Sequence, residues 1–172
     1  MRLPILLLLL TLGSAELLGQ RAQVKNILIV ISGSSDMKNP AVGDGRQLAA
    51  LLGHFEVTST IKSVVDYRDG ELDAYDLTFY VGFPIRNTPP VGFLNDVLSA
   101  TKPFVWINTG MMEFSNRPGV AARLGFAVTG IDSVSRFDRV RVGSTVLEKG
   151  EPHLGLIRIA STANVQTLAT AF

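Results

Sequence analysis

The chain of 172 residues contains no cysteine. This absence excludes disulfide bonds, thiolate metal sites and cysteine nucleophiles, because each of them needs the sulfur atom that cysteine supplies. It also excludes attachment of a lipid to an N-terminal cysteine. Any chemistry must therefore come from the hydroxyl, carboxylate, amide and basic side chains that remain.

Histidine is almost as scarce, with His54 and His153 as its two occurrences. They lack the H-x-x-H or H-x-x-x-H spacing that is typical of zinc sites, and no G-x-S-x-G elbow is present to position a nucleophilic serine. The acidic run over residues 66–76 lacks the D-x-D-x-D-G pattern of a calcium loop, so we interpret it as a solvated turn. The sequence predicts no metal site, and we favour a structural or solvated role for both histidines.

Patterns for nucleotides and nucleic acids are missing as well. No G-x-G-x-x-G or Walker sequence occurs, which argues against the familiar modes of nucleotide binding. The net charge is +1, and four arginines on the predicted late strands are not regularly interleaved with aromatic residues: Arg136, Arg139, Arg141 and Arg158. We therefore expect no cofactor and no nucleic-acid partner.

The N-terminus has the three parts of a signal peptide. Arg2 supplies a positive charge, Ile5–Leu12 is an apolar segment, and small residues allow cleavage after Ala15. A membrane anchor needs about 20 apolar residues, and Glu16 interrupts the stretch too early. We predict that residues 1–20 are a signal peptide, that the protein is periplasmic or extracellular, and that no stable membrane span is left after cleavage.

The strongest pattern in the rest of the chain is Asn26–Asp36, which reads NILIVISGSSD. Its apolar run, Ile27–Ile31, predicts a strand buried on both faces, as in the centre of a parallel sheet. Small and polar residues follow at the carboxyl end of this strand. Ligands bind at that end of the strands in open α/β sheets.

Strands and helices alternate through residue 110, which predicts a doubly wound, largely parallel α/β sheet. We expect the first helix to begin near Asp44, which forms a capping-box variant with Gln47, and to end with Gly53 in a left-handed C-cap. Thr88 is expected to cap the second helix. The expected strands are Ile27–Ile31, Val57–Ser63, Leu77–Val81 and a buried Phe104–Ile107, and the expected helices are Arg46–Leu52, Pro90–Ala100 and a short one over Gly119–Leu124.

The character of the sequence changes after this point. A β-hairpin is predicted by two strand patterns, Phe137–Val142 and Thr145–Leu147, that flank a glycine-serine turn. Leu156–Ala160 and Val165–Ala171 predict two more strands. We divide the chain into the signal peptide, an α/β domain over residues 24–130 and a β-rich extension over residues 131–172, which we expect to be truncated because it stops within an apolar run.

Three loops are expected to meet at the carboxyl edge of the sheet, over residues 32–36, 82–87 and 108–112. A polar ligand site is one interpretation of this edge, and ordinary solvated loops are the other. The residues that we predict to bind a ligand are Ser32, Ser34, Ser35, Asp36, Phe83, Arg86, Asn108 and Thr109. None of them is predicted to be catalytic.

Seven segments carry a resemblance to a known family: Asn26–Ser35, Gln47–Phe55, Val65–Tyr67, Tyr80–Gly82, Thr101–Trp106, Phe137–Leu147 and Leu168–Ala171. Together they resemble the N-terminal module of exported bacterial proteins in which an amidotransferase-like α/β domain precedes a polysaccharide-deacetylase-like domain. The resemblance implies a flavodoxin-like or class I amidotransferase-like, mostly parallel sheet with helices on both faces. It also implies a non-catalytic accessory domain, for binding or scaffolding, whose partner is a polysaccharide or a downstream deacetylase-like domain.

Two departures limit what the resemblance implies. The turn Asn108–Gly110 holds no cysteine where an amidotransferase-like fold would place its nucleophile, so glutaminase chemistry is not implied. A deacetylase domain with its metal ligands would begin after Phe172, so none of its residues is carried over. Three alternatives stay open: a stand-alone small-molecule-binding protein, a structural spacer, and a serine-type hydrolase that uses Ser34 or Ser35 with Asp36 and a histidine.

Overall fold

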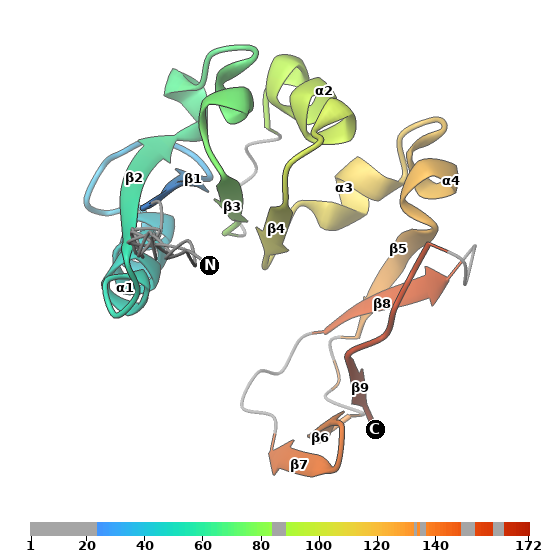
Figure 1. The fold of residues 1–172 in the computed structure, drawn as a ribbon. Helices are drawn as coiled ribbons and strands as arrows, with labels where there is room; N and C mark the ends of the chain where they lie inside the picture. The colour runs from blue at the N-terminus through green and yellow to red at the C-terminus, as the bar shows by residue number, and fades with distance from the viewer. Residues whose placement is uncertain (1–23, 84–88, 133, 135–136, 149–153, 160–163) are drawn as a thin grey trace, which may run out of the picture.

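The computed structural model of the protein describes residues 24–83, 89–132, 134, 137–148, 154–159 and 164–172. The predicted signal peptide, Arg86, Thr88, Arg136 and His153 lie outside these ranges. The described chain forms an α/β body over residues 24–125 and a β arm over residues 126–172 that extends away from it (Figure 1). No helix in the described ranges combines the length and the apolar character that a membrane crossing requires.

A parallel four-stranded sheet forms the centre of the α/β body. Its strands are β1 (Lys25–Ile31), β2 (Val57–Ser63), β3 (Leu77–Val81) and β4 (Phe104–Ile107), in the order β2-β1-β3-β4. The predicted bounds of β2, β3 and β4 are confirmed. Because the chain adds β2 on one side of β1 and then β3 on the other, the strand order reverses between β1 and β3.

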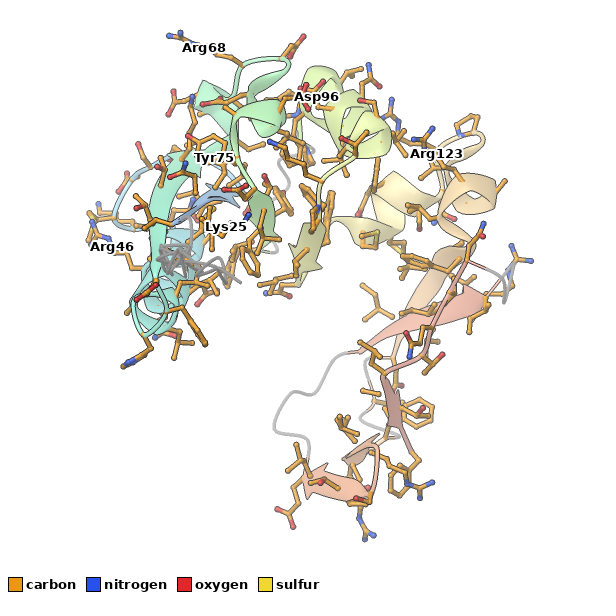
Figure 2. All side chains as sticks on the ribbon, in the orientation of Figure 1. Lys25, Arg46, Arg68, Tyr75, Asp96 and Arg123 are labelled. Carbon is orange, nitrogen blue, oxygen red and sulfur yellow. The ribbon has the colours of Figure 1, made fainter. Side chains whose placement is uncertain are left out.

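Helices cover both faces of this sheet. One face packs against α1 (Pro40–Leu52), and the other against α2 (Val91–Ser99), α3 (Met111–Ser115), α4 (Val120–Leu124) and two short 3-10 segments, η1 (Val64–Asp66) and η2 (Glu71–Ala74). Charged side chains such as Arg46 on α1 and Arg123 on α4 are exposed (Figure 2). The prediction of an α/β fold with a parallel sheet flanked by helices is confirmed.

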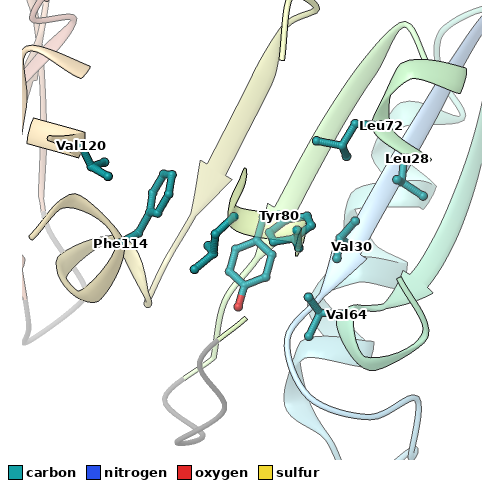
Figure 3. Close-up of a cluster of buried hydrophobic side chains, with 9 residues drawn as sticks. Leu28, Val30, Val64, Leu72, Tyr80, Phe114 and Val120 are labelled. Atoms are coloured by element: carbon teal, nitrogen blue, oxygen red, sulfur yellow. The ribbon is translucent and has the colours of Figure 1, made fainter. Parts of the chain in front are cut away.

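Side chains of β1 alternate between the two faces, as the pleat of a strand requires. Leu28 and Val30 are fully buried among aromatic residues of the α2 and α3 side (Figure 3). Within that cluster the ring centroids of Tyr80 and Trp106 lie 4.3 Å apart, and Trp106 stacks on Phe114 at 5.2 Å. This aromatic packing fixes β3, β4 and α3 relative to one another.

The helix α1 begins four residues before Asp44, so the predicted capping box is wrong. Asn39 is the N-cap, since its Oδ1 accepts a hydrogen bond from the N–H of Ala41 at 3.2 Å, and Pro40 occupies the first helical position. An Asn-Pro pair is a turn signal, but it is also a favourable start for a helix. The predicted left-handed cap is wrong too, because Gly53 has a helical φ of −62°.

The strand β4 lies at the edge of the sheet, and the prediction that it is buried is right for one face only. Phe104 and Trp106 pack into the aromatic cluster, whereas Val105 and Ile107 are 38% and 36% exposed on the opposite face. The hydrophobic cluster under α1 includes residues of β1, β2 and β3 but none of β4.

The β arm consists of two small antiparallel sheets. β5 (Phe126–Asp132) pairs with β8 (Leu154–Ile159), and β6 (Arg139–Val142) pairs with β7 (Thr145–Glu148) and with β9 (Ala169–Ala171). The predicted hairpin is confirmed as β6 and β7. The sequence analysis did not predict α3 or β5, and β5 spans the boundary that it placed at residue 130.

Two side chains just beyond the aromatic cluster attach the β arm to the body. The N–H of Val128 donates to Ser115 Oγ at 3.0 Å, and Asn116 Nδ2 donates to the carbonyl of Val128 at 3.0 Å. Both backbone groups need these partners because the β5–β8 ladder is irregular between Val128 and Gly130.

Candidate functional site

The carboxyl ends of β1, β3 and β4 bring together seven of the eight predicted ligand-binding residues. We call them the strand-end cluster: Ser32, Ser34, Ser35, Asp36, Phe83, Asn108 and Thr109. The eighth residue, Arg86, lies outside the described ranges. Hydrogen bonds between neighbouring strand ends set the positions of these loops.

Ser32 joins the ends of β1 and β3. Its N–H donates to the carbonyl of Val81 at 3.0 Å, and its Oγ accepts the N–H of Phe83 at 2.9 Å. The residue is only 1% exposed. Ser32 therefore supports the two loops from beneath and does not present its hydroxyl to solvent.

The loop after β1 is fixed by two residues that the sequence analysis missed. Asn39 is buried, and its Nδ2 donates to the carbonyls of both Ser32 and Ser34 at 2.7 Å. The hydroxyl of Ser63, at the end of β2, donates to the carbonyl of Gly33. Asn39 could have been recognised from the Asn-Pro pair at the start of α1, whereas no local pattern marks Ser63.

The side chains at the tip of this loop are exposed. The N–H of Asp36 donates to Ser34 Oγ at 3.4 Å, and Asp36 Oδ1 accepts the N–H of Lys38 at 2.9 Å. Ser34, Ser35 and Asp36 thus present two hydroxyls and a carboxylate to solvent from a backbone that is held underneath. Such groups exchange hydrogen bonds with polar ligands.

The loop after β4 lies tightly against the end of β3. A Cβ on Gly82 would come within 2.2 Å of the carbonyl oxygen of Thr109, so only glycine fits there. The same carbonyl accepts a hydrogen bond from Trp106 Nε1 at 2.9 Å. Asn108 has a left-handed φ of 69° and an exposed side chain. The cluster thus gains an amide group on a rigid turn.

Tyr80 is the buried titratable group nearest to the cluster. Its pKa is raised to about 12, mainly by burial; the negative charge of Glu113 also acts to raise the pKa, and a hydrogen bond with Ser32 acts to lower it. The phenol is therefore neutral at physiological pH and does not act as a base. Its role is to fill the space below Ser32 and to close the aromatic cluster.

The geometry separates the serines from His54. Asn39, the N-cap residue of α1, donates a hydrogen bond to the carbonyl of Ser34, whereas the N–H of His54 bonds to the carbonyl of Leu51 at the other end of the helix. A helix of 13 residues is about 20 Å long, at about 1.5 Å per residue. His54 is thus too distant to take a proton from Ser34.

The acidic run after β2 serves local structure. Glu71 forms an ion pair with Lys62 at 2.6 Å. Asp76 accepts the N–H of Asn26 at 2.8 Å, and this hydrogen bond holds the pKa of Asp76 below its usual range. In the part of the chain that the structure describes, no three acidic or imidazole side chains gather as a metal site would require.

Comparison of the chain with family models, with curated proteins and with solved structures finds no match. The site consists of exposed hydroxyl, carboxylate and amide groups on loops that the buried Ser32, Asn39 and Ser63 hold in place.

Proposed function

We propose that the chain is a non-catalytic accessory domain that binds a glycan within an exported carbohydrate-active protein. The observation that carries the proposal is the position of the strand-end cluster. Strand order reverses between β1 and β3, and ligands of open α/β sheets bind outside the carboxyl ends of the strands at such a switch point. In the proposed fold, which is flavodoxin-like or class I amidotransferase-like, that point falls between Ser32 and Phe83.

The chemistry of the cluster suits a sugar. Sugar hydroxyls donate and accept hydrogen bonds, and the exposed groups of Ser34, Ser35, Asp36 and Asn108 offer both. Because buried partners hold these loops, a ligand has little backbone entropy to remove when it binds. The signal peptide and the family resemblance support an exported, envelope-associated setting, with a polysaccharide or a downstream deacetylase-like domain as the partner.

Binding is tested by titrating the chain, and the full-length protein that contains it, with acetylated and deacetylated glycan fragments. We expect saturable shifts of the backbone amides of Ser34, Asp36 and Asn108. The fluorescence of Trp106, the single tryptophan, should change as well, because its Nε1 bonds to the loop carbonyl of Thr109.

A matched pair of variants gives the control. Asp36→Asn should weaken glycan binding about tenfold, the effect of losing a hydrogen bond to a charged group. Asp44→Asn makes the same chemical change on an exposed turn of α1 and should leave the affinity unchanged. If neither the chain nor the full-length protein responds to any glycan at millimolar concentration, the structural spacer is the remaining role. Ester hydrolysis that Ser34→Ala or Ser35→Ala abolishes would establish the hydrolase.

A further inference from the structure

A small pocket lies beside the strand-end cluster, on the α2 and α3 side of the sheet. Its volume is about 170 Å³, and its lining residues are Pro89, Val91, Leu94, Gly110, Glu113, Phe114 and Arg117. Gly110 belongs to the same turn as Asn108 and Thr109. A ligand that covers the cluster can therefore place a substituent in the pocket.

The size of the pocket indicates a substituent and not a whole ligand. Sites for complete small molecules measure about 300–1,000 Å³. The volume here equals the liquid share of about five or six water molecules, at about 30 Å³ each. A group of a few heavy atoms fits this space, while the remainder of the molecule must lie outside.

The walls define the polarity of that group. Pro89, Val91, Leu94 and Phe114 supply apolar surface, and the charged groups are those of Glu113 and Arg117. Arg117 Nη1 is buried and has no hydrogen-bond partner among the described residues. A buried donor without an acceptor is costly, so the guanidinium would gain from an acceptor that enters the pocket.

The surrounding charges favour a neutral acceptor. Glu113 lines the pocket together with Arg117. An anionic group would meet the Glu113 carboxylate as well as the single guanidinium. A carbonyl oxygen satisfies Arg117 without that repulsion, and an N–H on the same group satisfies Glu113.

We propose that this pocket binds the acetamido group of an N-acetylated sugar. Its carbonyl accepts a hydrogen bond from the Arg117 guanidinium, its N–H donates to the Glu113 carboxylate, and its methyl group lies against the apolar wall. This inference rests on the proposed glycan binding, since the sugar ring would lie over the strand-end cluster next to Gly110.

The test is an amide-shift titration of the chain with four probes: N-acetylglucosamine, glucosamine, N-methylacetamide and sodium acetate. We expect the first and third to shift Gly110, Glu113 and Phe114, and the other two to leave them unchanged. Arg117→Met should weaken N-acetylglucosamine binding at least tenfold. Arg123→Met removes an exposed arginine of α4 and should have no effect (Figure 2). Glu113→Gln should weaken binding by a smaller factor.

Other results separate this inference from the proposed function. Equal binding of glucosamine or acetate, or unchanged affinity in Arg117→Met, overturns the acetamido pocket even if glycans still shift Ser34 and Asp36. If N-methylacetamide shifts the pocket residues while no glycan shifts the strand-end cluster, the pocket binds an amide group as proposed. The proposed function, glycan binding, is then overturned. Thermal unfolding of each variant shows whether a loss of binding reflects a loss of fold.

Discussion

The α/β body and the β arm differ in how far their strands are buried. In the body, β1 is covered on both faces and paired on both edges, so Leu28 is 0% exposed. In the arm, β5 and β8 form a sheet of two strands, and Ile157 on β8 is 62% exposed. A two-stranded sheet has marginal stability by itself. The body therefore holds most of the stability of the molecule, while the arm depends on its attachment to the body.

The largest expected change in the free energy of unfolding comes from truncating an aliphatic side chain of the body, with the same kind of truncation in the arm as its control. Leu28→Ala should lower the free energy of unfolding by about 3 kcal/mol, because it removes fully buried contacts and leaves a cavity. Ile157→Ala should change it by less than about 0.5 kcal/mol, as is usual for exposed positions. Urea denaturation of both variants measures the difference. Equal losses would show that the arm is as well packed as the body.

Alkaline pH should destabilise the body through Tyr80, whose pKa is raised to about 12, mainly by burial. An unfolded tyrosine ionises near about pH 10. The stability from the neutral phenol is therefore complete below about pH 10, and about 2 kcal/mol of it is lost as the pH rises to about 12. Tyr80→Phe should flatten the curve of unfolding free energy against pH in this window.

Part of the alkaline slope should survive in that variant, because burial and a hydrogen bond to Asp96 also raise the pKa of Tyr67. Tyr67→Phe combined with Tyr80→Phe should flatten the curve further. An unchanged slope in Tyr80→Phe would mean that its hydroxyl is accessible to water and that the packing below Ser32 is looser than described.

The smallest expected change in unfolding free energy distinguishes the observed N-cap of α1, Asn39, from the predicted one, Asp44. Asn39→Ala removes the N-cap and the two hydrogen bonds to the loop after β1, and should cost about 1–2 kcal/mol in unfolding free energy. Asp44→Ala should cost almost nothing, since Asp44 lies in an exposed turn of the helix. Chemical denaturation measures both. A greater loss for Asp44→Ala would restore the predicted helix start.

The parallel sheet was predicted well because its signals are local. An apolar run such as Ile27–Ile31 is typical of a strand covered on both faces. The exposure of Val105 and Ile107 was not predictable, because it depends on how far α1 extends over the sheet. The strand β5 was missed because its pattern is broken by Gly130 at the irregular step in its ladder.

The candidate site was predicted in part for the same reason. Strand ends are visible in a sequence, so the exposed Ser34 and Asp36 were found. Ser32 was expected to touch a ligand and instead supports the loops, a role that depends on its bond to Phe83. The pocket around Arg117 was missed because its walls come from α2, α3 and the turn after β4, which meet only in the folded chain.

The attachment of the β arm makes α3 a mechanical link. Ser115 and Asn116 hold the N–H and the carbonyl of Val128, and Glu113, on the same short helix, lines the pocket. A tilt of the arm must either break these two hydrogen bonds or carry α3 with it. A force that pulls on β5 would therefore act first on these two hydrogen bonds and, through them, on the helix that bears Glu113.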